Sequence, residues 1–598
     1  MSTPASMKGG PHTTNVLAKR RYLVIYIFLI FLSLYTAQFE FWFYWNLVSF
    51  YTQTLLFYIL LPFWLFFMYV SFVIISLFYA KLFLIVINKI HPPTEGTFLR
   101  DISDKDYRYW SLRNVIKKWP FWLSHKFPLP FLDNLCFKVL GVQTKFSNSL
   151  FEGWVDNEFI EFGENVVVGQ SSIVYSTLIM GNLLIIRKTV IEDNVRIGAH
   201  AIVMPGTHMG KNCILAANSM TTVGQELEDN WVYLGLPAKK YKKNRFYEDG
   251  LEDILDKYIT DVNDIRERYE KLYTKRHDES LSFRDKFQRR MENIEKESER
   301  LKKGKKEELP KELKTGKKMS IKNVIKEEIT LQFHWYLLSF FIIYYSAFVI
   351  SGALVVWFHF TFYKFHFLDR LYLTEIIFNR ESILISILFP LLLIGSYILH
   401  LICVALSTRW VWRLTEKVSP SKNGVIPRGI PSKTLNLYHV RSFIIKYGKK
   451  AFQKGAFPWL ITWFYDFVGS DKIGKGTTLE EQFGCDRYVE IGENSYIGLH
   501  SAISSHVVEG IFGNLVYFKI NIGDNVTTAG MNCIGPGTDI NDNSYLLPLA
   551  SSAKHSKFKG DNYYFGAPLR KIFTRKVKKY LDLTDEDLEK DEELKKQQ

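Results

Sequence analysis

The clearest hydrophobic pattern in the chain has a period of six residues and lies between Ile191 and Thr221. An amphipathic helix would repeat every three to four residues and a half-exposed strand every two, so neither explains strict sixes. A period of six predicts a parallel β-helix, in which each side of a coil points one side chain inward. The same register is predicted to extend backwards to Phe162, which makes at least nine hexads. The inward positions are Phe162, Val168, Val174, Ile191, Ile197, Val203, Met209, Leu215 and Thr221.

Continuous apolar runs form the second pattern and predict membrane helices. After a polar N-terminus that ends in Lys19, Arg20 and Arg21, residues 22–35 are apolar, and residues 55–87 are almost wholly so. Similar runs return at 333–358 and 383–406. Roughly 20 apolar residues cross a bilayer. A signal peptide is the competing interpretation of the first run, but the corresponding run in mid-chain argues for membrane spans.

Matched Pro and Gly positions predict that the second half of the chain repeats the first. Adding 328 to the residue number takes Pro62 to Pro390 and Gly141 to Gly469; an offset of 329 relates Gly163 to Gly492, and 331 relates Pro237 to Pro568. Such residues are informative because they restrict backbone geometry. The expected fold is therefore a multi-pass α-helical membrane protein with two left-handed parallel β-helices, in tandem duplication.

This organisation predicts nine regions. They are a polar basic N-terminus (1–21), membrane helices of unit 1 (22–90), an amphipathic membrane-apposed connection (91–150), the first β-helix (151–245), a charged helical and flexible linker (246–330), membrane helices of unit 2 (331–408), a second connection (409–470), the second β-helix (471–573) and a charged tail (574–598).

Charge and cysteine usage narrow the possible partners. The net charge is +15 and much of it lies in Lys-rich connecting segments, which suits an anionic membrane surface. No nucleic-acid motif accompanies this charge, so membrane lipids are the expected partner and nucleic acid is not. The five cysteines show no CxxC spacing, which favours reduced structural thiols over a zinc site or a disulfide framework. No metal is predicted.

The two copies differ at one pair of residues that carries chemistry. The second copy has His506 and Glu509 before an irregular excursion, where the first has Thr177 and Met180. A neutral imidazole is well matched to removing a proton near pH 7, and a carboxylate can orient it. The alternative is a surface histidine without a role, because one His and one Glu three apart often occur by chance.

The hexads, closed by Gly235-Leu236-Pro237 and by Gly566-Ala567-Pro568, resemble the hexapeptide acyltransferases. The wider layout resembles the membrane-embedded tandem C-terminal region of nonribosomal-peptide-synthetase-like poly-lysine synthetases. These resemblances imply that His506 is the general base, with Glu509 supporting it and His500 in reserve. They also imply that Gly535, Gly566, Ala567 and Pro568 accommodate a pantetheine arm, and that the first β-helix is non-catalytic.

The expected function is therefore an integral-membrane acyltransferase that moves an acyl group from acyl-CoA, or from a carrier-bound phosphopantetheine thioester, to a hydroxyl or amine. The acceptor is a small molecule, lipid, sugar or amino acid. One alternative is an amide-bond-forming aminoacyl transferase that uses a separate carrier protein, and another is a non-enzymatic membrane scaffold with degenerate β-helices.

Two membrane spans in each half would bring both β-helices, both termini and the linker to one side of the membrane. Their basic clusters identify that side as the cytoplasm under the positive-inside rule. Assembly is left open between a homo-oligomer and internal pairing of the two β-helices, because single hexapeptide domains usually trimerise.

Overall fold

The computed structural model describes residues 14–597 apart from 52–53, 127–128, 151–152, 245–332, 428–431, 482, 485–486 and 510–513. The described residues up to 244 and from 333 onwards form one compact unit. The predicted charged linker at 246–330 lies outside the described residues, as do Cys485 and the start of the chain before Thr14.

Four helical segments within the described residues are long and apolar enough to cross a bilayer: Tyr22–Leu47, Leu55–Ile90, His334–Leu368 and Arg380–Val418. Pro62 and Pro390 stand inside the second and fourth, where they interrupt the helical hydrogen bonding locally without ending the helix. The segments belong to α1 (Tyr22–Tyr51), α2 (Thr54–Ile90), α8 (Phe333–Phe340), η4 (Phe341–Tyr345), α9 (Ser346–Phe358), η5 (His359–Leu368) and α11 (Arg380–Val418), with the short α10 (Leu373–Phe378) before α11.

Shorter helices join the long ones to the β-structure. Asp104 caps α3 by accepting a hydrogen bond from the Tyr107 amide, and Ser432 caps α12 in the same way. We expected residues 91–150 to be amphipathic, but most side chains of α3 are buried, because α3 packs against both α1 and α2. The helices are α3 (Lys105–Ser124), α4 (Pro130–Leu140), α12 (Lys433–Gln453), η6 (Pro458–Leu460), α13 (Ile461–Val468), α14 (Thr574–Leu581) and α15 (Asp585–Gln597).

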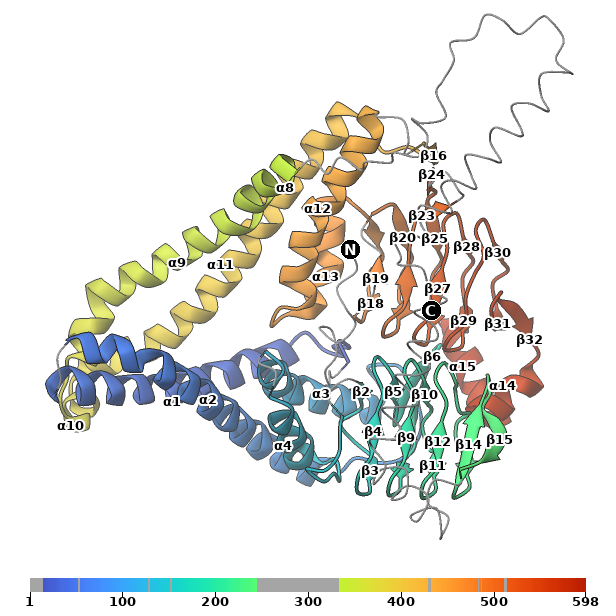
Figure 1. Ribbon diagram of the computed structural model, residues 1–598, viewed down its shortest axis with the longest axis horizontal. Helices are drawn as coiled ribbons and strands as arrows, with labels where there is room; N and C mark the ends of the chain where they lie inside the picture. Colours follow the sequence, from blue (N-terminus) through green and yellow to red (C-terminus); the bar gives the residue numbers. More distant parts are fainter. Residues whose placement is uncertain are drawn as a thin grey trace, which may run out of the picture. The chain divides into compact units, whose positions relative to one another are not determined.

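Residues 154–234 form three parallel sheets that we call the N-terminal stack (Figure 1). Paired strands lie one coil apart, as in Ile197 beside Leu215, so a regular coil takes three hexads. The sheets contain β2 (Trp154–Val155), β5 (Ile173–Val174) and β10 (Ile202–Val203); β3 (Ile160–Phe162), β8 (Thr189–Ile191), β11 (His208–Met209) and β13 (Glu226–Leu227); and β4 (Val167–Val168), β9 (Arg196–Ile197), β12 (Ile214–Leu215) and β14 (Trp231–Leu234), which β15 (Lys239–Lys243) extends in antiparallel fashion. This is the predicted β-helix.

An antiparallel hairpin interrupts this stack, so the prediction of nine hexads in one register is wrong. Strands β6 (Thr177–Met180) and β7 (Leu183–Ile186) pair with each other and with β1 (Gly96–Leu99). Gly181, with φ of +61°, lies in the tight turn between them. The coil that contains the hairpin is therefore longer than three hexads, and it places Phe162 beside Ile191. Apart from Thr177, the strand residues of the hairpin are apolar, and all of them are buried.

Residues 472–565 form three further parallel sheets, which we call the C-terminal stack (Figure 1). Ile522 lies beside Ile540, again three hexads away, whereas Ile491 lies beside Ile522 across a longer coil. The sheets contain β17 (Lys472–Ile473), β20 (Val489–Ile491), β25 (Ile520–Ile522), β28 (Asp539–Ile540) and β30 (Lys557–Phe558); β18 (Thr478–Leu479), β21 (Tyr496–Ile497), β26 (Thr527–Thr528), β29 (Ser544–Leu546) and β31 (Asn562–Phe565), which β32 (Arg570–Ile572) extends in antiparallel fashion; and β19 (Phe483–Gly484), β22 (Ala502–Ile503) and β27 (Cys533–Ile534).

The excursion predicted in the second half is also a hairpin. It consists of β23 (His506–Glu509) and β24 (Asn514–Tyr517), and β16 (Gly424–Ile426) adds a third antiparallel strand. The excursion is therefore common to both stacks. The long coil is slightly longer in the C-terminal stack, from Ile491 to Ile522, than in the N-terminal one, from Phe162 to Ile191. This difference is the change from 329 to 331 in the sequence offset.

The corners of the coils are made by residues in the left-handed backbone region, where Asn is among the few favoured non-glycine residues. Asn194, Asn212 and Asn230 have φ between 56° and 60° and lie above one another. The Asn194 side chain donates to that of Asn212 at 3.2 Å, and Asn212 donates to Asn230 at 2.9 Å. His200 and His500 also stand at corners, with φ of 55° and 54°.

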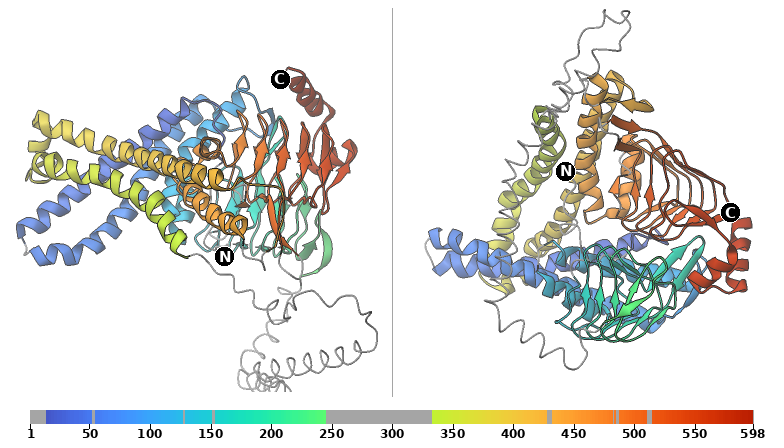
Figure 2. Two further views of the ribbon diagram at one scale, coloured as in Figure 1. Left: turned by 90° about the horizontal axis from the view of Figure 1, so that it is seen from above. Right: turned by 45° about the vertical axis from the view of Figure 1, so that its right-hand side comes forward.

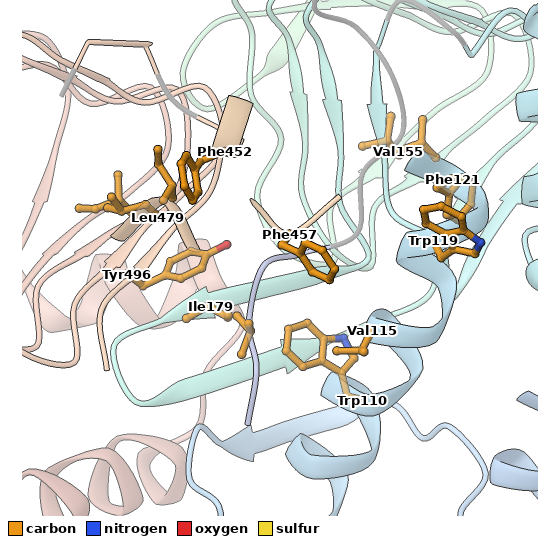
Figure 3. Packing of buried hydrophobic residues seen from close by; sticks show 14 of the residues in the cluster. Trp110, Val115, Trp119, Phe121, Val155, Ile179, Phe452, Phe457, Leu479 and Tyr496 are labelled. Atoms are coloured by element: carbon orange, nitrogen blue, oxygen red, sulfur yellow. The ribbon is translucent and has the colours of Figure 1, made fainter. Parts of the chain in front are cut away.

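One hydrophobic core runs from the helices into both stacks. Figure 3 shows Trp110 and Trp119 of α3 near Phe457, with Ile179 of the hairpin and Tyr496 of β21 in the same cluster. Hydrogen bonds also connect the halves: the Tyr26 hydroxyl donates to the Ala456 carbonyl at 2.6 Å. Figure 2 shows from two further directions that α1, α2, α9 and α11 extend away from the sheets of both stacks. The core therefore lies where the helices meet the stacks.

Candidate functional site

His506 begins strand β23, at the edge of the antiparallel sheet of the C-terminal stack. It pairs directly with Tyr517, and its ring lies 5.5 Å from the ring of Tyr438 on α12. The Arg487 guanidinium stacks on the Tyr438 ring at 3.8 Å. His506 is half-buried, so part of its surface is exposed to solvent.

Position 509 ends the same strand and pairs with Asn514. Successive residues of a strand point to alternate faces, so positions three apart belong to opposite faces. The strand therefore gives the His506 and Glu509 positions no common face. The predicted support of His506 by Glu509 stays a prediction.

His500 lies at a different place, the junction of the two stacks. Its side chain is buried, and its ring meets the Trp154 ring of the N-terminal stack edge to face at 4.9 Å. Nearby, the Tyr175 hydroxyl donates to the Ala529 carbonyl at 3.2 Å. Within the hairpin turn, the Gly181 amide donates to the Thr527 hydroxyl at 3.1 Å. The two stacks thus contact each other directly, and His500 is the predicted site residue that stands at this contact.

The junction also contains acidic side chains that the sequence analysis did not single out. Asp156 is enclosed, and burial raises the pKa of its carboxyl although the Thr177 hydroxyl and amide both donate to it, at 2.7 and 2.8 Å. Glu480 accepts from the Asn15 amide at 2.7 Å, and burial likewise raises its pKa. Between Asp156, Glu480 and Tyr496 lies a cavity of about 10 Å³. That volume holds no more than about one water molecule.

The N-terminal segment passes through this region. Asn15, Val16 and Ala18 are buried, and Asn15 donates from its side chain to the Leu479 carbonyl at 3.2 Å. Lys118 donates to the Asn15 side-chain oxygen, and burial lowers the pKa of Lys118. The predicted polar terminus therefore forms part of the junction from residue 14 onwards. The side chains that meet here come from distant positions in the sequence, so no local sequence pattern predicts their contact.

A second buried network lies beside the junction. Glu158 accepts from Arg113 and from Lys117, each at 2.8 Å, and both cations are 2% exposed. Burial opposes the ionisation of Glu158, but Lys117 and Arg113 outweigh it, so the pKa of Glu158 is lowered. Burial lowers the pKa of Lys117 to about 8 despite Glu158. The spacing of Arg113 and Lys117, one helical turn apart, was the available sequence signal for a shared anion.

The loop predicted for a pantetheine arm caps the C-terminal stack. The Ala567–Pro568 peptide is cis, as is Leu236–Pro237 in the N-terminal stack, and Gly566 has φ of +95°. The Gly566 carbonyl accepts from the Ser551 amide at 3.0 Å. Gly535 follows β27, where its amide donates to the Ser552 hydroxyl at 3.0 Å. The structure therefore brings Gly535 and this loop together around Ser551 and Ser552.

The hexapeptide repeat of the N-terminal stack is similar to repeats in known proteins. Residues 188–222 match the family model described as bacterial transferase hexapeptide (six repeats). A galactoside O-acetyltransferase of Lactococcus lactis is 37% identical over 78 residues, which are 12% of this chain and 37% of the relative. A 2,3,4,5-tetrahydropyridine-2,6-dicarboxylate N-acetyltransferase of Staphylococcus aureus is 31% identical over 93 residues, 16% of this chain and 37% of the relative. The chain thus spans little over a third of these relatives.

Solved structures show the same kind of similarity at low identity. A hexapeptide-repeat acetyltransferase of Vibrio cholerae is 18% identical, with 20% of this chain and 84% of that chain covered and a TM-score of 0.17. A galactoside acetyltransferase in complex with coenzyme A is 17% identical, with 20% and 74% covered and a TM-score of 0.17. Among these matches, the family model carries the most weight: residues 188–222, on the β-helix of the N-terminal stack, are similar to the bacterial transferase hexapeptide repeat.

Proposed function

We propose that this protein is an acyltransferase that moves an acyl group from acyl-CoA to a hydroxyl or amine acceptor. The observation that carries the proposal is the hexapeptide repeat at 188–222, which is shared with acetyltransferases. Relatives are described as acting on a galactoside or a tetrahydropyridine dicarboxylate, which supports a small-molecule acceptor. A fold does not establish an activity, so individual side chains must be tested.

The proposal includes a tandem duplication of two left-handed β-helices. Its support is that both stacks have regular coils of three hexads, and that each has one longer coil holding an antiparallel hairpin. In each case a strand from the preceding connection, β1 or β16, completes the hairpin sheet. The loops that close the stacks share a cis X–Pro peptide. Two unrelated domains would have no reason to agree in all these features.

For catalysis we assign proton removal to His506. The imidazole takes the proton of the acceptor while the acceptor oxygen or nitrogen attacks the thioester carbonyl carbon. The carbon–sulfur bond then breaks, and the proton passes from His506 to the leaving sulfur. Glu509 is proposed to support the imidazolium, and Gly535, Gly566, Ala567 and Pro568 to accommodate the pantetheine arm. The half-buried position of His506 supports the assignment, because the acceptor can reach it. His500, which is enclosed beside a water-sized cavity, is the second candidate.

We propose further that the four long helices span a membrane. Their outward faces are apolar, with Phe63, Phe78 and Phe348 among the exposed side chains. An even number of spans in each half returns both stacks and both termini to the cytoplasmic side, where acyl-CoA is made. In sealed vesicles with this side outward, protease should cleave the linker at 299–328. Protection of the linker would contradict the arrangement.

The catalytic assignment is tested by acyl transfer from radiolabelled acetyl-CoA with purified His506→Ala, His500→Ala and Glu509→Gln proteins. His208→Ala is the matched control, because His208 is an exposed strand histidine paired with Glu192. We expect His506→Ala to lose at least about 100-fold in rate, and the control to keep the wild-type rate. Loss in His500→Ala alone would move the base to the junction.

Two alternatives are outcomes of the same experiment. Transfer only from an aminoacyl carrier protein, and not from acetyl-CoA, would identify an amide-bond-forming enzyme of the synthetase-like kind. Absence of transfer by the wild-type protein from either donor would leave a membrane scaffold. Whether the chain forms homo-oligomers in addition to the internal contact is decided by its mass in detergent.

A further inference from the structure

An open cleft of about 560 Å³ lies at the end of α11, and neither His500 nor His506 lines it. It is formed between the last turns of α11 and helix α13, and its lining includes Arg409, Arg413, Trp463 and Phe467. Arg409 follows Leu406, the last residue of the continuous apolar run at 383–406, by three positions. If α11 spans the membrane as proposed above, the cleft lies where the hydrocarbon core ends and lipid headgroups begin.

The two arginines of this cleft have no carboxylate partner among the residues that the structure describes. Arg409 stacks on the Phe467 ring at 4.3 Å, and Arg413 is exposed. Glu416 also lines the cleft, but its charge is compensated: it lies 3.0 Å from Arg441 and accepts from the Ser421 amide at 2.9 Å. Asp466, the remaining carboxylate, is exposed and can be solvated. Two guanidinium groups four positions apart on a helix lie on the same side of it, where they can contact one anion together.

The surface of α11 beside the arginines is apolar beyond the end of the hydrophobic span. Exposed side chains recur at every fourth position, and they range from 37% exposed at Ile398 to 59% at Trp410. This row continues to the last residue of the helix. It consists of Ile398, Ile402, Leu406, Trp410, Leu414 and Val418. Trp463 of α13 is also exposed. Tryptophan beside arginine is typical of the membrane–water interface, and water alone would not favour such a row.

The corresponding place in the first half of the chain lacks these features. Subtracting 328 takes Arg409 to Lys81 and Arg413 to Ile85. Lys81 is used within the protein, because its ammonium donates to the Val139 carbonyl at 2.7 Å. One basic residue that is engaged and one isoleucine cannot bind an anion between them. The arginine pair therefore occurs in the second half alone. If the fold common to both halves required these arginines, the first half would have them too.

We propose that this cleft binds the phosphate of an anionic membrane lipid. The guanidinium groups of Arg409 and Arg413 donate to the phosphate oxygens, and the acyl chains pack along Leu406, Trp410 and Leu414. The shared chemistry is a phosphate with a net negative charge. A lipid supplies it together with an apolar chain, whereas free phosphate would leave the exposed row uncovered. The site is separate from His506 and His500, and its occupancy does not depend on acyl transfer.

The test is native mass spectrometry of the full-length protein in detergent, titrated with dioleoyl phosphatidylglycerol. Dioleoylglycerol, which lacks the phosphate, and inorganic phosphate form the other two arms. We expect saturable binding of phosphatidylglycerol, no saturable binding of dioleoylglycerol, and no displacement of the lipid by millimolar phosphate. Displacement by phosphate at the concentration of the lipid would replace the lipid proposal with a free-phosphate site.

The variants decide whether the arginines are responsible. Arg409→Gln with Arg413→Gln should lower the affinity for phosphatidylglycerol about tenfold or more, since each basic residue near an anionic surface contributes to binding. Lys571→Gln with Arg575→Gln, which removes two exposed charges elsewhere, should leave it unchanged. Arg413→Gln alone is expected to fold normally, because this exposed side chain makes no contact in the described residues that would stabilise the fold, so it separates a loss of binding from misfolding. Asp466→Asn should raise the affinity for phosphatidylglycerol. Wild-type affinity in the double arginine variant would overturn the proposal, whatever the acyl transfer assay shows.

Discussion

Glu158→Gln is expected to destabilise the junction of α3 and the N-terminal stack strongly. The substitution keeps the size and shape of the side chain but removes the charge that Arg113 and Lys117 share at 2.8 Å. Both cations are 2% exposed, so solvent cannot replace the carboxylate. Removing one partner of a buried ion pair costs about 3–5 kcal/mol. For a cooperative unit of about 150–250 residues, this corresponds to a fall in Tm of roughly 6–20 °C.

The assay is thermal unfolding of the purified protein in detergent, followed by tryptophan fluorescence. Glu164→Gln is the matched control, because Glu164 forms an ion pair with Lys145 at 3.4 Å in which both side chains are mostly exposed. Such a pair contributes about 0–1 kcal/mol, so the control should melt close to the wild type. Equal melting of Glu158→Gln and Glu164→Gln would refute the reasoning.

The pH dependence provides a second check on the same variant. The pKa of Glu158 is lowered in the folded protein, so the folded state binds this proton less readily than the unfolded state. The stability that Glu158 contributes is therefore present above its ordinary pKa and is lost as the pH falls through the lowered value. We expect the Tm of wild type and variant to differ at pH 7 and to converge in acid. A constant difference down to low pH would show that the charge is not the cause.

Three further predictions concern burial. Burial raises the pKa of the Cys213 thiol to about 12, whereas Cys533 is exposed. Iodoacetamide at pH 8 should therefore modify Cys533 and reach Cys213 only after unfolding. Peptide mass spectrometry measures the two modifications, and early modification of Cys213 would contradict its burial. Tyr175→Phe removes a hydrogen-bond donor to a carbonyl of the other stack and should lower the free energy of unfolding by about 1 kcal/mol, measured as a lower Tm. An unchanged Tm would mean that this hydrogen bond contributes nothing to stability. Gly448→Ala places a Cβ about 2.1 Å from the Phe464 ring and should lower the free energy of unfolding by about 1–3 kcal/mol. Gly395→Ala is the control, because the space beside Gly395 is open. Equal stability of the two variants would refute the packing argument.

The hexad pattern predicted the β-helix correctly where the coils are regular, because each inward position needs only an apolar side chain of the right period. It failed at Thr177–Ile186. The interval from Val174 to Ile191 is not a multiple of six, and this was the available warning. The hairpin there is apolar like the coils, so its composition does not distinguish the two. What separates them is the antiparallel pairing with β1, a strand that lies far away in the sequence.

The candidate site was likewise predicted only in part from the sequence. Comparison of the two halves of the sequence singled out His506 and Glu509 because the halves differ at these positions, and their spacing suggested a pair. The strand that contains them places the two positions on opposite faces, and this depends on the pairing of β23 with β24. His500 attracted less attention, although the fold puts it against Trp154, which belongs to the other half of the chain. The arginine cleft likewise depends on the packing of α13 against the end of α11.

The sequence by itself determined the features that arise from local repetition: the coils of six, the apolar runs and the correspondence of the two halves in Pro and Gly. These follow from constraints that act within a few residues, so a linear pattern carries them. Only the tertiary structure decided which buried charges meet, where the N-terminal segment passes, and which histidine stands at the contact of the stacks. Those outcomes depend on contacts between distant parts of the chain, whose energies are set by desolvation and packing at places that no local pattern marks.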